Sequence, residues 1–206
     1  MAMSELPSYI MIMKKHSGYT LIELMAILSV IAIVLATGLP LMSIFFQGNR
    51  MVSNTNEIVA GLHIARSEAI KQQMRVTMCQ STNRATCAGT GSWEDGFIVF
   101  QDPNGNATVD GGERILRINT GADGKQVTVR SDDGGSNQIK NAVTFTSRGL
   151  PKLLNGTSTS GTFRVCDSRG KRMNTDNETT VARGVVLSIS GRVRTTKTAA
   201  KIASCP

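Results

Sequence analysis

The first 50 residues constrain this chain most, because they contain a long apolar run that follows two lysines. Residues 24–46 carry only three polar side chains, those of Ser29, Thr37 and Ser43. A helix of this length spans roughly 34 Å, which is enough to cross a hydrocarbon core of about 30 Å. Lys14 and Lys15 precede the run, so the positive-inside rule predicts a cytoplasmic N-terminus and an external remainder. We therefore expect a chain anchored in a membrane by one helix.

The residues before the apolar run differ from an ordinary secretory signal, in which a short apolar region precedes the cleavage site. Lys14-Lys15-His16-Ser17-Gly18-Tyr19-Thr20-Leu21-Ile22-Glu23 resembles the class III leader of type IV pilins and pseudopilins. The resemblance implies that a prepilin peptidase cuts between Gly18 and Tyr19, that the new amine of Tyr19 is methylated, and that the helix stays on the mature protein. Two departures are Tyr19, where Phe is commoner, and the long leader 1–18. The start codon can be Met1 or Met13.

Glu23 is the only charged residue between the predicted cleavage site and Arg50. A carboxylate at the edge of a bilayer is costly unless it reaches water or a partner. The residues alone allow either alternative, a Glu23 that reaches interfacial water or a Glu23 that pairs with a partner. The pilin resemblance implies pairing with the amino group of a neighbouring subunit during filament assembly. The resemblance also matches Pro40 to a mid-helix proline, and the missing backbone donor predicts a kink or local melting there.

The rest of the chain is long enough for one external domain with its own core. The sequence has only one Trp, two Tyr and six Phe, with 20 Gly, which favours short strands and many turns. Four cysteines on the external side favour disulfides. Among the possible pairings we expect a local Cys79–Cys87 bond, with Cys166 bonded to the C-terminal Cys205. Their spacing and the two histidines, His16 and His63, do not suit a zinc site.

The periodicity beyond the membrane segment predicts more helix and then strands. Apolar residues recur at helical intervals and predict an amphipathic stripe, made of Met51, Ile58, Leu62, Ala65, Ala69 and Ile70. From Arg75 onward the pattern changes, and it predicts strands over 76–80, 97–101, 114–118, 126–130, 142–146, 162–166, 184–190 and 192–195. No helical pattern separates them, which favours antiparallel pairing. We expect an α+β architecture in which a long N-terminal helix packs on antiparallel sheets.

Several blocks narrow the resemblance to one group of pilins. Ala65-Arg66-Ser67-Glu68-Ala69-Ile70-Lys71, residues 93–102 and residues 163–170 are similar to segments of the GspH/FimT/FimU minor pilins and pseudopilins. The resemblance implies the type IV pilin fold, with a leader at 1–18, a transmembrane half at 19–48 and an external domain at 49–206. It also implies a bacterial inner-membrane protein that enters a cell-surface filament with other major and minor pilins.

The basic C-terminal segment is the main candidate for binding. Gly191-Arg192-Val193-Arg194 resembles the Gly-Arg-x-Arg motif of FimT-type pilins, which bind DNA during natural transformation. No acidic residue follows Glu178, whereas five cations do, and they supply most of the net charge of +8: Arg183, Arg192, Arg194, Lys197 and Lys201. Lys171 and Arg172 are possible flanks.

Two arginines spaced by one residue on a strand project to the same face, where their guanidinium groups suit adjacent phosphate oxygens. No aromatic residue follows Phe163, so base stacking is disfavoured. We expect sequence-independent contact with the DNA backbone, in which about four or five neutralised phosphates give a salt slope near −4.

Other functions stay open at this point. Cations also protect edge strands, so a purely structural minor pilin or a GspH-like pseudopilin that primes pilus assembly or type II secretion is the alternative. Residues 102–113 place oxygen ligands at EF-hand spacings, but Ala107 stands where glycine is needed and strands flank the segment, so we expect a polar loop and no metal. No catalytic triad or phosphate-binding loop occurs, so we expect no enzymatic activity and no cofactor.

Overall fold

The computed structural model describes residues 18–89, 91–121, 126–131, 139–153, 156–202 and 205, without the side chains of residues 40, 41 and 201. Apart from Gly18, the predicted leader lies outside these residues. The chain forms two compact units, Met1–Ser43 and Ile44–Pro206. A helix, α1 (Leu21–Gln72), begins in the first unit and extends into the second. The prediction for Pro40 was a kink or local melting; the backbone is helical there, which excludes the melting and leaves the kink untested.

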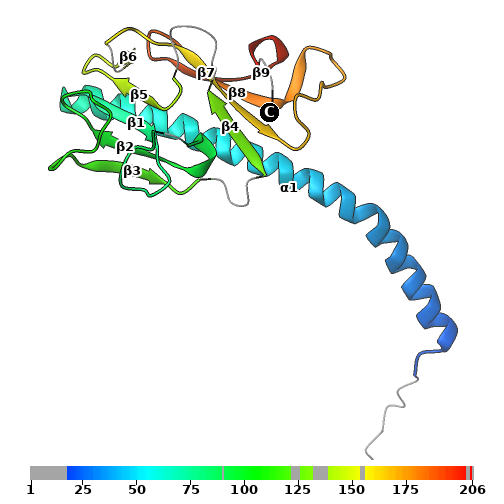
Figure 1. Cartoon of the computed structure of the whole chain (residues 1–206). Coiled ribbons are helices and arrows are strands. Elements are labelled where there is room, and N and C mark those ends of the chain that lie inside the picture. Colours follow the sequence, from blue (N-terminus) through cyan, green and yellow to red (C-terminus); the bar gives the residue numbers. More distant parts are fainter. Residues whose placement is uncertain are drawn as a thin grey trace, which may run out of the picture. The chain divides into compact units, whose positions relative to one another are not determined.

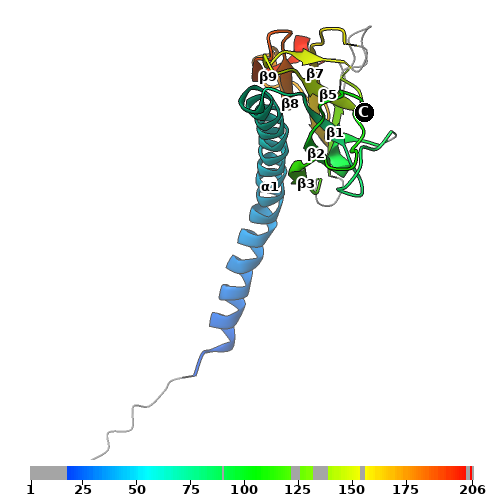
Figure 2. The same ribbon diagram turned by 90° about the vertical axis from the view of Figure 1, so that its left-hand side faces the viewer.

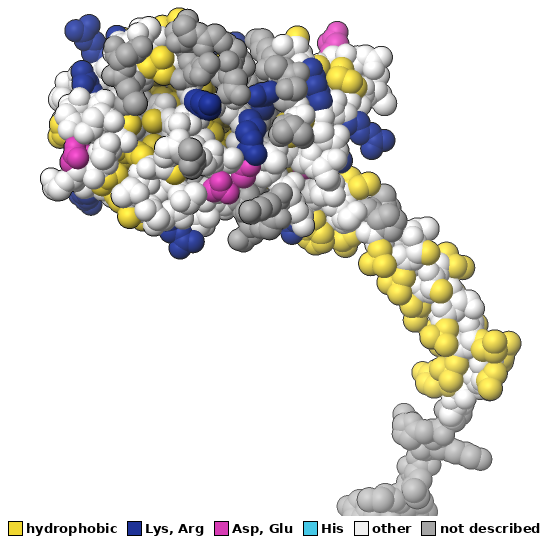
Figure 3. Space-filling model, in the orientation of Figure 1, with side chains coloured by type: hydrophobic (Ala, Val, Ile, Leu, Met, Phe, Trp, Pro, Cys, Tyr) yellow, Lys and Arg dark blue, Asp and Glu magenta, His cyan; other side chains and the backbone are white. Residues whose placement is uncertain are grey.

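The part of α1 in the first unit is long and apolar enough to cross a membrane. Its apolar side chains are exposed along the helix (Figure 3). Two of the polar side chains in this segment are satisfied locally, because their hydroxyls bond to the preceding turn. Ser29 Oγ donates to the carbonyl of Met25 at 2.7 Å, and Thr37 Oγ1 donates to that of Ile33 at 3.2 Å. These hydrogen bonds to the backbone satisfy both hydroxyls without water, as is required of polar groups inside a hydrocarbon layer.

The second unit adds two antiparallel sheets to the remainder of α1 (Figure 1). The first has the order β3-β2-β1-β5-β6 and comprises β1 (Val76–Gln80), β2 (Phe97–Gln101), β3 (Ile115–Asn119), β5 (Ala142–Phe145) and β6 (Pro151–Lys152). The second has the order β4-β7-β8-β9 and comprises β4 (Val127–Ser131), β7 (Gly161–Asp167), β8 (Thr179–Leu187) and β9 (Val193–Thr198). Two 3₁₀ turns, η1 (Trp93–Asp95) and η3 (Ala199–Lys201), complete the described elements. The expected α+β architecture is confirmed.

Both sheets lie on one side of the second half of α1, and one core fills the space between them (Figure 2). The helix contributes five buried residues of the predicted stripe, Met51, Ile58, Leu62, Ala65 and Ala69. Ile70, the sixth, is 42% exposed, since it is adjacent to Ala69 and points about 100° away from it around the helix. Trp93 packs edge-on against Phe163 with ring centroids 5.0 Å apart, which joins the turn before β2 to the second sheet.

The C-terminal strands differ from the predicted ranges. β8 begins at Thr179, five residues before the expected start at Gly184, and it ends at Leu187 because a turn occupies residues 188–191. Gly184 lies inside the strand, where an added Cβ would come within 2.9 Å of Thr196 Cγ2 across the pair with β9. Gly184 therefore allows β8 and β9 to pack closely, and in the sequence such a glycine looks like the end of a strand. The two-residue strand β6 was not predicted.

Candidate functional site

The predicted processing segment lies at the start of α1. Gly18, Tyr19 and Thr20 precede the first helical residue and are exposed. Thr20 Oγ1 accepts a hydrogen bond from the backbone N–H of Glu23 at 3.3 Å, as an N-cap residue does. Glu23 therefore lies in the first turn, where a negative charge interacts favourably with the helix dipole. Its side chain is exposed and accessible to a partner outside this chain.

Two disulfides form, with the expected pairing. Cys79 bonds Cys87 over a separation of 8 residues, and Cys166 bonds Cys205 over 39 residues. The second bond holds the C-terminal segment against the outer face of the β7–β8 pair. Ile202 is fully buried there with Cys166 and Ala182. Because β9 precedes this segment, the disulfide closes the C-terminal end of the edge strand.

The Gly-Arg-x-Arg motif spans the end of the turn between β8 and β9 and the first two residues of β9. The N–H of Gly191 donates to the carbonyl of Ser188 at 2.8 Å, and the N–H of Arg192 donates to Ser188 Oγ at 3.0 Å. Gly191 has φ of +75°, a conformation that other residues adopt at a cost. We call residues 188–192 the motif turn. Arg192 belongs to this turn and not to the predicted strand, because β9 begins at Val193.

The motif turn is held in place by its neighbours. A Cβ on Gly191 would lie 2.2 Å from the carbonyl oxygen of Gly149, so the backbones of two turns from different sheets touch here. Arg66 of α1 donates from Nη2 to the carbonyl of Ser190 at 3.2 Å. The Nε of Arg66 is buried, and no protein atom in the described residues accepts from it. This helix residue belongs to the site, although its sequence environment gave no sign of that role.

The predicted cations fall into two groups. Arg192 and Arg194 are exposed at the motif turn and the start of β9. Arg183 and Lys197 instead line a cavity of about 170 Å³, together with Arg169 and with helix residues that include Gly48. The side chain of Lys201 lies outside the described part of the chain. The predicted five-cation cluster is therefore divided along β9, which the linear sequence could not indicate. Within the described residues, Arg192, Arg194 and Lys197 form no ion pair.

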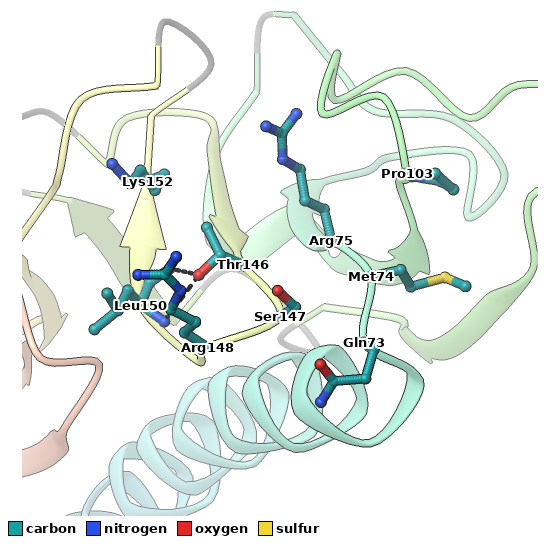
Figure 4. Close-up of a pocket in the computed structure, with 9 residues that line it drawn as sticks. All are labelled: Gln73, Met74, Arg75, Pro103, Thr146, Ser147, Arg148, Leu150 and Lys152. Carbon is teal, nitrogen blue, oxygen red and sulfur yellow. Dashed lines mark hydrogen bonds between the residues drawn. The ribbon is translucent and has the colours of Figure 1, made fainter.

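A second group of cations surrounds a cleft that was not predicted (Figure 4). Arg75, Arg148 and Lys152 line a cavity of about 650 Å³ beyond the end of α1, and its lining in the described part of the chain contains no carboxylate. We call it the basic cleft. Its three cations come from separate segments, the residue before β1, the turn after β5, and β6. No short motif could reveal such a site.

The loop with EF-hand-like spacing uses its oxygens internally. Asp102 is fully buried, and its carboxylate accepts from the N–H groups of Gly105 and Ala107 and from the Thr77 hydroxyl. Ala107 takes φ of +53° at the position where an EF-hand requires glycine. The flanking segments are β2 and β3, as expected. No group of three or more potential ligands in the described residues is placed to hold a metal.

Comparisons with known proteins agree with this architecture. Residues 13–39 match the profile of the prokaryotic N-terminal methylation motif, and residues 54–191 match that of the type II transport protein GspH. No curated protein matches the chain. A crystal structure of the type IV minor pilin FimU from Pseudomonas aeruginosa is similar, with a TM-score of 0.51 and 22% identity over 79% of this chain and 99% of that one. The minor pseudopilin EpsH of the Vibrio cholerae type 2 secretion system has a TM-score of 0.42 and 11% identity, covering 71% and 94%. The GspH match spans most of the chain, and the protein therefore belongs to the GspH family as a minor pilin or pseudopilin of the GspH/FimT/FimU type.

Proposed function

We propose that this minor pilin binds extracellular DNA through the motif turn and β9 for uptake during natural transformation. The observation that carries the proposal is the construction of the motif turn. Gly191 is fitted against Gly149, and Arg66 holds the carbonyl of Ser190, so the turn presents Arg192 in a defined position. Arg192, Arg194 and Lys197 are exposed and lack ion-pair partners among the described residues. Such cations suit a phosphate backbone.

The binding test uses the full-length protein in uncharged detergent micelles and a fluorescent DNA duplex. Arg192→Gln with Arg194→Gln removes two phosphate contacts, so the slope of log K against log salt should fall in magnitude by about 1.8. Arg84→Gln with Lys140→Gln is a matched control that also removes two positive charges. Both residues are exposed, and they belong neither to the motif turn nor to β9. If the motif variant and the control variant bind as the wild type does, the motif turn does not contact DNA.

We also propose that the N-terminal segment works as in other members of the superfamily. A prepilin peptidase cuts between Gly18 and Tyr19, the amine of Tyr19 is methylated, and Glu23 pairs with the amine of a neighbouring subunit. The leader then faces the cytoplasm, the transmembrane half is 19–48, and the domain 49–206 is external. The exposure of Gly18 and Tyr19 supports access by the peptidase. Mass spectrometry of the protein from its host tests cleavage; an intact precursor would exclude it.

A priming role in pilus assembly or type II secretion is the second candidate. It is favoured by the match of residues 54–191 to the type II transport protein GspH. Deletion of the gene separates the two candidates. Loss of DNA uptake with normal piliation supports the DNA receptor, whereas loss of pili or of protein secretion supports the priming subunit.

A further inference from the structure

We propose that the basic cleft is a second phosphate-binding site, which continues the DNA track from the motif turn. This inference rests on the proposed DNA-binding function. It differs from it in the residues involved, because Arg75, Arg148 and Lys152 belong to no basic motif in the sequence.

The cleft carries positive charge that its own lining does not neutralise. A smaller cavity of about 140 Å³ shares Arg75, Thr146 and Lys152 with the larger one, so the two cavities are adjacent. Among the described residues, no carboxylate lines either cavity, and the other lining groups are uncharged. Asp102, next to Pro103 of the cleft, is fully buried and is occupied by internal hydrogen bonds. Three cations without a local counter-charge attract an anion.

Two of the cations are held in place by neutral acceptors. Arg75 Nη1 donates to the carbonyl of Asn104 at 2.9 Å, and Lys152 Nζ donates to that of Gly156 at 2.8 Å. A carbonyl restrains a cation without removing its charge, and both side chains keep further donors. Arg148 is exposed in a turn closed by the hydrogen bond from Gly149 N–H to the Thr146 carbonyl at 2.8 Å. Figure 4 shows Arg148 and Lys152 on one side of the cleft and Arg75 on the other.

The cleft adjoins the motif turn through the contact between the two glycines. Arg148 precedes Gly149 and Arg192 follows Gly191, whose added Cβ would lie 2.2 Å from the Gly149 oxygen. With standard backbone dimensions, this contact limits the separation of the Arg148 and Arg192 Cα atoms to at most about 14 Å. One strand of duplex DNA carries a phosphate every 3.4 Å or so along its axis, so more than one phosphate of a strand lies within that distance. A single DNA strand can therefore reach both sets of cations.

The test measures duplex binding by fluorescence anisotropy with the full-length protein in uncharged micelles, at roughly 50 to 200 mM salt. The cleft variant is Arg148→Gln with Lys152→Gln, and the control is Arg84→Gln with Lys140→Gln, which removes the same two charges. Loss of two phosphate contacts predicts a slope smaller in magnitude by about 1.8 and binding roughly 30-fold weaker at 0.15 M salt. The control should stay within about twofold of the wild type.

Each outcome is decisive for the cleft. If the cleft variant binds like the control while Arg192→Gln with Arg194→Gln weakens binding, the cleft proposal is wrong and the proposed function stands. If the wild type does not bind DNA, both are wrong. Circular dichroism checks the fold of each variant. Should the double variant be unstable, Arg148→Gln alone is used, since this exposed turn residue lies outside the core, and the slope should then fall by about 0.9.

Discussion

Replacing Gly191 with alanine should destabilise the protein through two separable effects. The first is the backbone conformation, since φ of +75° costs an L-residue about 1–2 kcal/mol. The second is the contact with the Gly149 carbonyl oxygen, which would lie 2.2 Å from the new Cβ. That oxygen is part of the backbone, so the motif turn must move and lose the hydrogen bond from Arg66 to Ser190. A hydrogen bond from a charged group contributes about 1.5–3 kcal/mol.

The sum is about 3–5 kcal/mol, which corresponds to a decrease in Tm of roughly 6–20 °C for a chain of this size. Gly170→Ala is the matched control. Gly170 also ends a turn and has φ of +63°. Its N–H donates to the carbonyl of Asp167 at 2.9 Å, as the N–H of Gly191 donates to the carbonyl of Ser188. A Cβ there would meet nothing within 4 Å. This variant should therefore lose only about 1–2 kcal/mol.

The assay is thermal unfolding of both full-length variants in the same micelles, followed by circular dichroism. DNA binding is measured on the same samples, and only Gly191→Ala should weaken it. If the two alanine variants show equal decreases in Tm, the contact between the motif turn and Gly149 does not contribute to stability, and the reasoning from packing is refuted.

Three further predictions concern other contacts. Arg66→Met removes the donor to the Ser190 carbonyl, so it should lower the free energy of unfolding by about 1–3 kcal/mol, as measured by urea unfolding. It should also weaken DNA binding although Arg66 need not touch DNA; unchanged DNA affinity of the folded variant would contradict this positioning role. Removing the Cys166–Cys205 bond should cost about 4 kcal/mol and removing Cys79–Cys87 about 2.6 kcal/mol, since the first closes the longer loop; paired Cys→Ser variants compared by urea unfolding test the order. The hydrogen bond from the Thr179 side chain lowers the pKa of Asp176, so its stabilising effect is complete above the unfolded pKa and is lost as the pH falls through the lower folded pKa. Asp176→Asn should therefore be less stable than the wild type at neutral pH, and the difference should shrink below about pH 4; a constant difference would exclude the linkage.

Most of the fold could be predicted because its strongest patterns are local. β1 and β2 have the predicted bounds, since both are apolar runs that end at polar turns. The start of β8 was missed because Thr179 and Thr180 give a weak pattern, and their pairing with Thr198 and Met173 is not visible in the local sequence. β6 has two residues, too few to produce a periodicity.

The candidate site was less predictable, because it depends on contacts between distant segments. The motif was visible as a local string, and its exposed arginines are where a binding role requires them. Arg194 and Lys197 are three residues apart on β9, so their side chains project to opposite faces of the strand. The approach of Gly149 to Gly191 joins two sheets, and neither residue type indicates its partner.

The tether between Arg66 and Ser190 has a mechanical consequence. This hydrogen bond connects the turn between β8 and β9 directly to α1, in addition to the strand pairing that holds the turn in the second sheet. At the other end of the same hairpin, the covalent link at Cys205 keeps the outermost strand from peeling away. A ligand bound at the motif turn would thus transmit part of a pulling force to α1, the element best suited to bear tension along a filament.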